Sequence, residues 1–150
     1  RMVLEGGTAW YAAQRATAED LKNIRACYEQ IAHFQILGDD DQAAIADAKF
    51  HLAIAEASHN LVLIQMMRGL FDLLQYNVVL GRRKVYTEAH RFDQLHDQHF
   101  QVMDAIERQD PEAARSAVCG HIEFVVQQVR MIDEEDARRQ RASRLNRIAP

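Results

Sequence analysis

The amino-acid sequence predicts an all-α fold, an antiparallel bundle of about six helices with no sheet. Apolar residues recur at steps of three and four along most of the chain, which is the period of an amphipathic helix. No stretch alternates strictly between apolar and polar residues in the way that a half-buried strand does. Only two prolines occur, Pro111 and Pro150, so little in the sequence interrupts a helix.

The first three helices are separated by residues that start or stop helices. The first is expected to end near Ala16, and its apolar residues are Val3, Leu4, Trp10, Tyr11 and Ala13. Thr17 is a suitable N-cap for the second helix, because acidic residues follow it in the first turn. The second helix stops at Gly38, and a third is expected from about Asp39 to Ser58.

Three further helices are expected in the second half of the chain. Asn60 caps the fourth and most apolar one, which is predicted to run to about Arg83. A fifth helix extends to the boundary with the sixth, where Asp110 caps and Pro111 takes the first helical position. The sixth helix is expected to continue as an exposed extension that frays into a basic C-terminal tail over 137–150.

The length and composition fit one domain spanning the whole chain. A chain of 150 residues can bury a core without disulfides, and its two cysteines have no metal-cluster or redox spacing. Buried thiols in a reducing compartment are therefore expected, which favours a cytoplasmic protein. The net charge of −4 argues against a nucleic-acid-binding module in this segment. No apolar run approaches the ~20 residues that cross a membrane, so no membrane partner is expected.

Four residues form a candidate site for a divalent metal ion. Asp47 and His51 stand four positions apart in a predicted helix, so both can reach one ion from the same face. His99 and His121 each lie on the apolar stripe of a later helix. Inward polar groups need partners, and three imidazoles with one carboxylate satisfy one another most economically around a cation. This donor set suits zinc first, with nickel or manganese as alternatives.

Other interpretations of the histidines stay open at this point. The four residues could simply hydrogen-bond to one another in the core, and His96, one turn before His99, is a competing ligand. Surface positions near helix ends are expected for His33, His59 and His90. Glu56 and His59 form one Glu-x-x-His motif, but a di-iron bundle needs two. No motif typical of hydrolases occurs, so binding is expected rather than catalysis.

Several stretches in combination resemble one known family. They are Asp47 to Asn60 with its Asp-x-x-Phe-His start, Gln98 to Ile106, Asp110 to Ala114, and the later His121. Their order resembles the FCD domain, the C-terminal effector domain of FadR-branch transcription regulators in the GntR superfamily. The resemblance covers nearly the whole chain and implies that the Asp/His quartet holds the metal. One departure is His59, which stands where the family often has glycine.

The resemblance also implies a residue that recognises the effector. The stretch from Arg1 to Glu5 matches the family's Arg-x-x-Leu/Ile-Glu on the first effector-domain helix. A guanidinium matches the geometry of a carboxylate, so Arg1 is a candidate ligand-binding residue. An exposed helical arginine without a ligand is the alternative.

The function that the resemblance implies is sensing, and not an enzyme activity. Residues 7–13, 50–60 and 67–69 are similar to lactate-responsive members of the family, so the expected effector is a small hydroxycarboxylate such as lactate. Pyruvate, glycolate or a sugar acid are alternative effectors, and a metal-dependent enzyme on a helical bundle is the alternative from another class. The chain starts without methionine. We therefore expect a piece of a homodimeric regulator that binds operator DNA through a missing N-terminal winged-helix domain.

Overall fold

The computed structural model describes residues 1–71 and 89–148, and every regular element in these ranges is a helix. The helices are α1 (Met2–Arg15), α2 (Ala18–Ile36), α3 (Asp40–Ala57), a segment over 61–71, α5 (Ala89–Glu107) and α6 (Pro111–Ile148). The predicted all-α fold is confirmed. The predicted end of the fourth helix near Arg83 lies outside the described residues. Within the described part, no helix has the length and apolar character to cross a bilayer.

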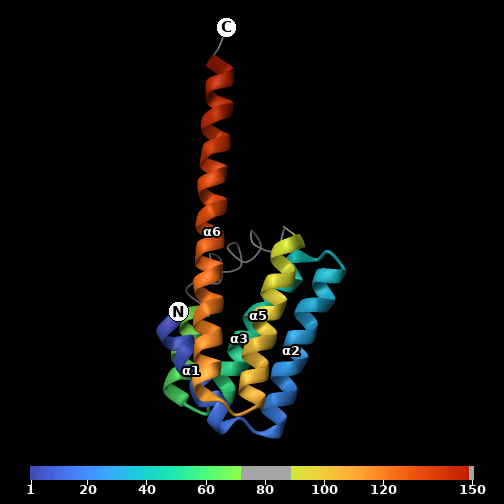
Figure 1. The fold of residues 1–150 in the computed structure, drawn as a ribbon, viewed down its shortest axis with the longest axis vertical. Coiled ribbons are helices and arrows are strands. Elements are labelled where there is room, and N and C mark those ends of the chain that lie inside the picture. The colour runs from blue at the N-terminus through green and yellow to red at the C-terminus, as the bar shows by residue number, and fades with distance from the viewer. Residues whose placement is uncertain (72–88, 149–150) are drawn as a thin grey trace.

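The helices pack side by side around one core (Figure 1). α2 packs against α3, α1 and α5 both pack against α6, and α1 also contacts α3 and α5. All five labelled helices contribute buried apolar residues to the same cluster. Phe50 is fully buried in it, with its ring centroid 5.1 Å from that of His99 and 5.6 Å from that of His51. The core therefore encloses the histidines rather than lying beside them.

The predicted helix boundaries follow from local hydrogen bonds. Thr17 and Asp20 form a capping box at the start of α2, in which each side chain accepts a hydrogen bond from the other residue's backbone N–H. α2 ends at Ile36, and the turn that follows passes through Gly38, whose φ of 71° lies in the left-handed region that glycine adopts without strain. Asp39 caps α3 and Asp110 caps α6 through their carboxylates.

A left-handed backbone conformation also occurs at His59. Its φ is 47°, so a side chain is carried in a conformation that normally costs free energy. The imidazole Nε2 lies 2.7 Å from a carboxylate oxygen of Asp20, and this contact ties the end of α3 to the start of α2. The hydrogen bond offsets part of the backbone cost.

The last helix is longer than the sequence predicts. α6 is one helix of 38 residues, about 57 Å long at the ~1.5 Å rise per residue of an α-helix. Its C-terminal half extends beyond the other helices (Figure 1), and residues 133–141 are exposed. The expected fraying tail is therefore helical through Ile148. No glycine or proline occurs in α6 after Gly120, and Glu134 pairs with Arg130 at 3.1 Å and with Arg138 at 3.8 Å.

The buried face of α1 differs from the predicted one. Val3 is 88% exposed, whereas the buried residues are Glu5, Gly6, Thr8, Ala9, Ala12 and Ala13. Small residues occupy the buried face of α1 because this helix lies close to α6. A Cβ on Gly6 would lie 3.0 Å from the Sγ of Cys119. Both cysteines are free thiols, with Cys27 buried as predicted and Cys119 only partly buried.

Candidate metal centre

The four predicted ligands meet at one place inside the bundle. α3 supplies Asp47 and His51, α5 supplies His99, and α6 supplies His121. One potential ligand atom from each lies within 4.8 Å of the others, and each residue is at most 2% exposed. Residues that are up to 74 positions apart in the chain thus share one buried cluster, which we call the Asp/His cluster.

The ring nitrogens of the Asp/His cluster converge on the carboxylate. Oδ1 of Asp47 lies 2.8 Å from Nε2 of His99 and 3.6 Å from Nε2 of His51. The ring of His121 is 4.4 Å from that of His99 and 5.2 Å from that of His51, measured between centroids. Nitrogen and oxygen donors packed this closely in a dry core are a suitable donor set for a transition metal or zinc.

Two further polar residues hold the outer nitrogens of the rings. Oε2 of Glu5 lies 2.8 Å from Nδ1 of His51, and Oε1 of Gln98 lies 3.1 Å from Nδ1 of His121. A carboxylate or amide oxygen at this distance suits a ring with its proton on Nδ1, and in that tautomer Nε2 keeps its lone pair for the interior of the cluster. Metal-bound histidines commonly have such partners, which fix the tautomer and the ring orientation.

The sequence interpretation did not single out Glu5 or Gln98. A signal for Glu5 was present, because Glu5, Ala9 and Ala12 are spaced by four and three and so lie on one face. Gln98 carries no comparable signal, since it is only partly buried and adjacent to a ligand in the chain.

A comparison with protein families agrees with this arrangement: the model of the FCD domain matches residues 1–124. The chain belongs to the FCD domain family. FCD domains are parts of GntR-family transcription regulators and sense small-molecule effectors. The family predicted from the sequence motifs is thus confirmed.

Curated relatives of this FCD domain are transcription regulators. The "Putative L-lactate dehydrogenase operon regulatory protein" of Escherichia coli K12 is 46% identical over 97% of this chain and 55% of that protein. The "Glc operon transcriptional activator" of the same strain is 30% identical over 90% of this chain and 54% of its own length. The chain therefore spans about half the length of these relatives. Both relatives are named as transcription regulators and not as enzymes.

A solved structure shares the same fold. The Escherichia coli protein McbR/YncC superposes with a TM-score of 0.71 and covers 90% of this FCD domain and 65% of its own chain. Only 21% of the aligned residues are identical, so this likeness concerns the fold alone.

The charged groups around the Asp/His cluster shift one another's pKa values. Burial raises the pKa of Glu5, but the charges and hydrogen bonds of His51 and Arg1 outweigh it and hold this pKa far below its usual value. Burial lowers the pKa of His51, but the negative charges of Glu5 and Asp47 outweigh it and raise this pKa above 6.5. A cation at the cluster is therefore favoured electrostatically, whether it is a proton or a metal ion.

Arg1, the predicted effector-binding residue, reaches the cluster through Glu5. Its Nε lies 2.7 Å from Oε1 of Glu5, the carboxylate oxygen that does not face His51. The Nη2 atom is buried and has no hydrogen-bond partner among the residues that the structure describes. Arg1 therefore keeps a buried donor available next to the Asp/His cluster.

The remaining histidines lie outside the cluster. His96, the competing ligand, stacks on Tyr28, and its Nε2 lies 2.6 Å from the tyrosine hydroxyl. His33 and His59 are exposed as predicted, whereas the side chain of His90 lies outside the described part of the chain. Glu56 pairs with Arg68 at 2.7 Å and His59 pairs with Asp20 at 2.7 Å, so the two residues of the Glu-x-x-His motif have different partners.

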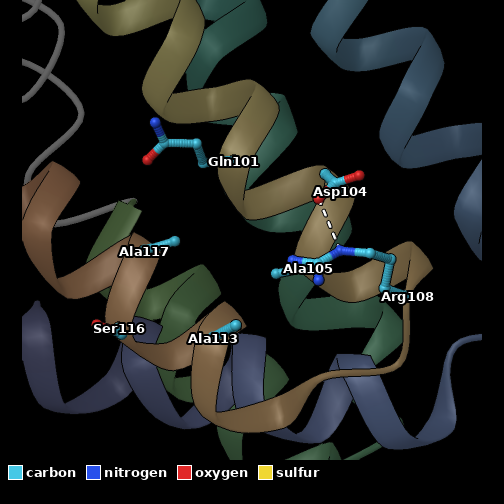
Figure 2. Close-up of a pocket in the computed structure, with 7 residues that line it drawn as sticks. All are labelled: Gln101, Asp104, Ala105, Arg108, Ala113, Ser116 and Ala117. Carbon is cyan, nitrogen blue, oxygen red and sulfur yellow. Dashed lines mark hydrogen bonds and ion pairs between the residues drawn. The ribbon is translucent and has the colours of Figure 1, made fainter.

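A groove on the surface is separate from the Asp/His cluster. It lies between the C-terminal part of α5 and the N-terminal part of α6 and has a volume of about 340 Å³ (Figure 2). Its lining is made of Gln101, Asp104, Ala105, Arg108, Ala113, Ser116 and Ala117. Asp104 and Arg108 form an ion pair of 2.8 Å at its edge. No predicted ligand lines it, so the groove is not the metal centre.

Proposed function

We propose that this FCD domain senses a small hydroxycarboxylate, with L-lactate as the first candidate, at a divalent metal ion held by Asp47, His51, His99 and His121. The observation that carries the proposal is the convergence of these four buried donors from three helices within 4.8 Å. Three imidazoles and one carboxylate favour zinc, with nickel or manganese as alternatives. When bound, such an ion supplies a Lewis-acid anchor for the hydroxyl and carboxylate oxygens of the effector.

The surrounding residues suit an anionic effector. Nη2 of Arg1 is buried with no hydrogen-bond partner among the described residues, and Nε of the same guanidinium is bound to Glu5. A carboxylate placed there would accept a hydrogen bond from Arg1, and charge-assisted hydrogen bonds of this kind are the stronger ones. Asp47 and Glu5 repel an anion, and the positive charges of the metal ion and of Arg1 would together offset this repulsion.

Because the Asp/His cluster is buried, effector binding requires a change in the packing of the surrounding helices. The four donors are at most 2% exposed, so an effector reaches them only when the surrounding helices move apart. A ligand that binds one packing better than another shifts the balance between the two. In a homodimer, that shift would change the spacing of the DNA-binding parts, which we place in the portion of the regulator that this chain does not cover.

The choice of lactate rests on similarity. The lactate-operon relative is 46% identical, whereas the Glc operon activator is 30% identical. Pyruvate, glycolate and sugar acids remain alternative effectors of the same site, because they also present a carboxylate beside a second oxygen donor.

Calorimetry tests this function. The zinc-loaded protein is titrated with L-lactate, D-lactate, pyruvate and glycolate, and the metal-free protein with the same acids. We expect saturable binding of L-lactate to the zinc-loaded form and a large loss of affinity in the metal-free form. Absence of binding by every short hydroxy or carboxylic acid contradicts the proposal.

A further inference from the structure

We propose that Glu5 is a positioning residue for the metal centre, which holds the Nδ1–H of His51 and thereby presents Nε2 of this ring to the ion. The inference rests on the proposed function, because it requires that the Asp/His cluster binds a metal. It assigns a role to a residue on α1, a helix that contributes none of the four ligands. It also makes α1 part of the metal centre.

Each carboxylate oxygen of Glu5 has a different partner. Oε2 lies 2.8 Å from Nδ1 of His51, and Oε1 lies 2.7 Å from Nε of Arg1. A carboxylate of this kind only accepts hydrogen bonds, so the proton sits on Nδ1 of the ring. In a neutral imidazole the lone pair is then on Nε2, which is the atom that faces Asp47.

The close packing of α1 against its neighbours fixes the position of the Glu5 backbone. The next residue, Gly6, brings α1 so close to α6 that a Cβ there would lie 3.0 Å from Sγ of Cys119. Thr8 and Ala9 are buried on the same face, and the Thr8 hydroxyl donates to the carbonyl oxygen of Glu5 at 2.9 Å. Any change in the docking of α1 therefore moves the partner of His51.

A simple anchor for α1 would not need a buried charge. Glu5 is 2% exposed, and removing a carboxylate from water is costly unless its partners compensate. Arg1 supplies one positive charge, so Arg1, Glu5 and Asp47 together carry one net negative charge when the three imidazoles are neutral. That excess favours a divalent cation in the Asp/His cluster over an empty one.

The test measures zinc affinity, by competition with a chelator, and the visible absorption of the Co²⁺ form for the wild type, Glu5→Gln and Glu5→Ala. Glu112→Gln is the matched control, because Glu112 holds α1 through Trp10 Nε1 at 3.0 Å and is exposed. We expect about 10–100-fold weaker zinc binding in Glu5→Ala, the range for lost outer partners of metal-bound histidines. Glu5→Gln, whose amide oxygen still accepts the hydrogen bond, should lose less affinity but shift the Co²⁺ bands. The control should change neither.

A role in folding alone predicts a different pattern. In that case Glu5→Gln and Glu112→Gln lower the unfolding temperature while zinc affinity and the Co²⁺ bands stay at wild-type values. That result overturns the inference and leaves the proposed function standing. A wild type that binds neither ion overturns both together.

A measurement on the wild type keeps the inference testable if the variants do not fold. Nitrogen NMR of the zinc-loaded, ¹⁵N-histidine-labelled protein reports which ring atom of His51 carries the proton. We expect the proton on Nδ1 and the metal on Nε2. The opposite tautomer, with Nδ1 bound to zinc, contradicts the assigned role of Glu5.

Discussion

Asp47 and His99 join α3 to α5 at the centre of the bundle, with Oδ1 of the aspartate 2.8 Å from Nε2 of the histidine. Both side chains are almost completely buried. A carboxylate and an imidazole that meet in a dry core stabilise each other, and a cation between them stabilises both. Asp47 and His99 therefore contribute both to the stability of the bundle and to the proposed sensing function.

Removal of two ligands should abolish stoichiometric metal binding. In the His99→Ala, His121→Ala double variant, two donors from two helices are lost, and Asp47 and His51 alone leave most coordination positions unfilled. We expect the zinc content by elemental analysis to fall from one per chain to near zero. His33→Ala is the control, since His33 is exposed and its ring contacts Phe34 outside the cluster. Unchanged stoichiometry in the double variant refutes the ligand assignment.

Gln98 should matter for metal affinity, although it is not a ligand. Gln98→Ala removes the oxygen that lies 3.1 Å from Nδ1 of His121 and frees the orientation of this ring. Zinc binding should weaken by about 10–100-fold. Gln101→Ala is the matched control on the same helix, because Gln101 is exposed at the surface groove (Figure 2). Equal affinities of the two variants contradict the role of Gln98.

Phe50 should be among the costliest residues to truncate. The ring is fully buried between helices and packs against the imidazoles of His51 and His99. Phe50→Ala should lower the free energy of unfolding by about 3–5 kcal/mol, measured by denaturant titration of the metal-free protein. Phe100→Ala, at a position that is 49% exposed, should cost much less. A loss below about 1 kcal/mol at Phe50 is inconsistent with this packing.

Asp20 should contribute a pH-dependent part of the stability. Burial raises its pKa, but hydrogen bonds from Thr17 and His59 outweigh burial and lower the pKa below 3.8. The stabilisation is therefore present above pH 3.8 and is lost as the pH falls through the lowered value. Asp20→Asn should cost about 0.3–1 kcal/mol at pH 6, as for an acidic residue in a first helical turn. The difference in stability between the two proteins should shrink as the pH falls below 3.8, and a constant difference contradicts this account.

The sequence predicts most of the fold because its helix boundaries depend on interactions between residues that are close in the chain. Thr17, Gly38, Asp39, Asn60 and Asp110 stop or start helices through interactions within a few residues, and the structure has boundaries at all of them. The faces are harder to predict. α1 buries small residues and exposes Val3, because its close packing on α6 depends on residues more than 100 positions away.

The candidate site was predictable as a set of residue types but not as a network. The spacing of Asp47 and His51 and the apolar stripes around His99 and His121 point inward, and the structure brings these four together. Their outer partners depend on tertiary contacts: Glu5 reaches His51 only after α1 docks on α3. Helical periodicity could not separate His96 from His99, and the structure separates them by placing His96 on Tyr28.

The most direct test of the account is a crystal structure of the protein grown with zinc and L-lactate, with diffraction recorded on both sides of the zinc absorption edge. The anomalous difference map should contain one strong peak per chain, about 2.0–2.2 Å from donor atoms of Asp47, His51, His99 and His121. Lactate density should adjoin this peak and the guanidinium of Arg1. No peak in the Asp/His cluster, or a peak on other residues, would contradict the central claim that these four residues hold the metal.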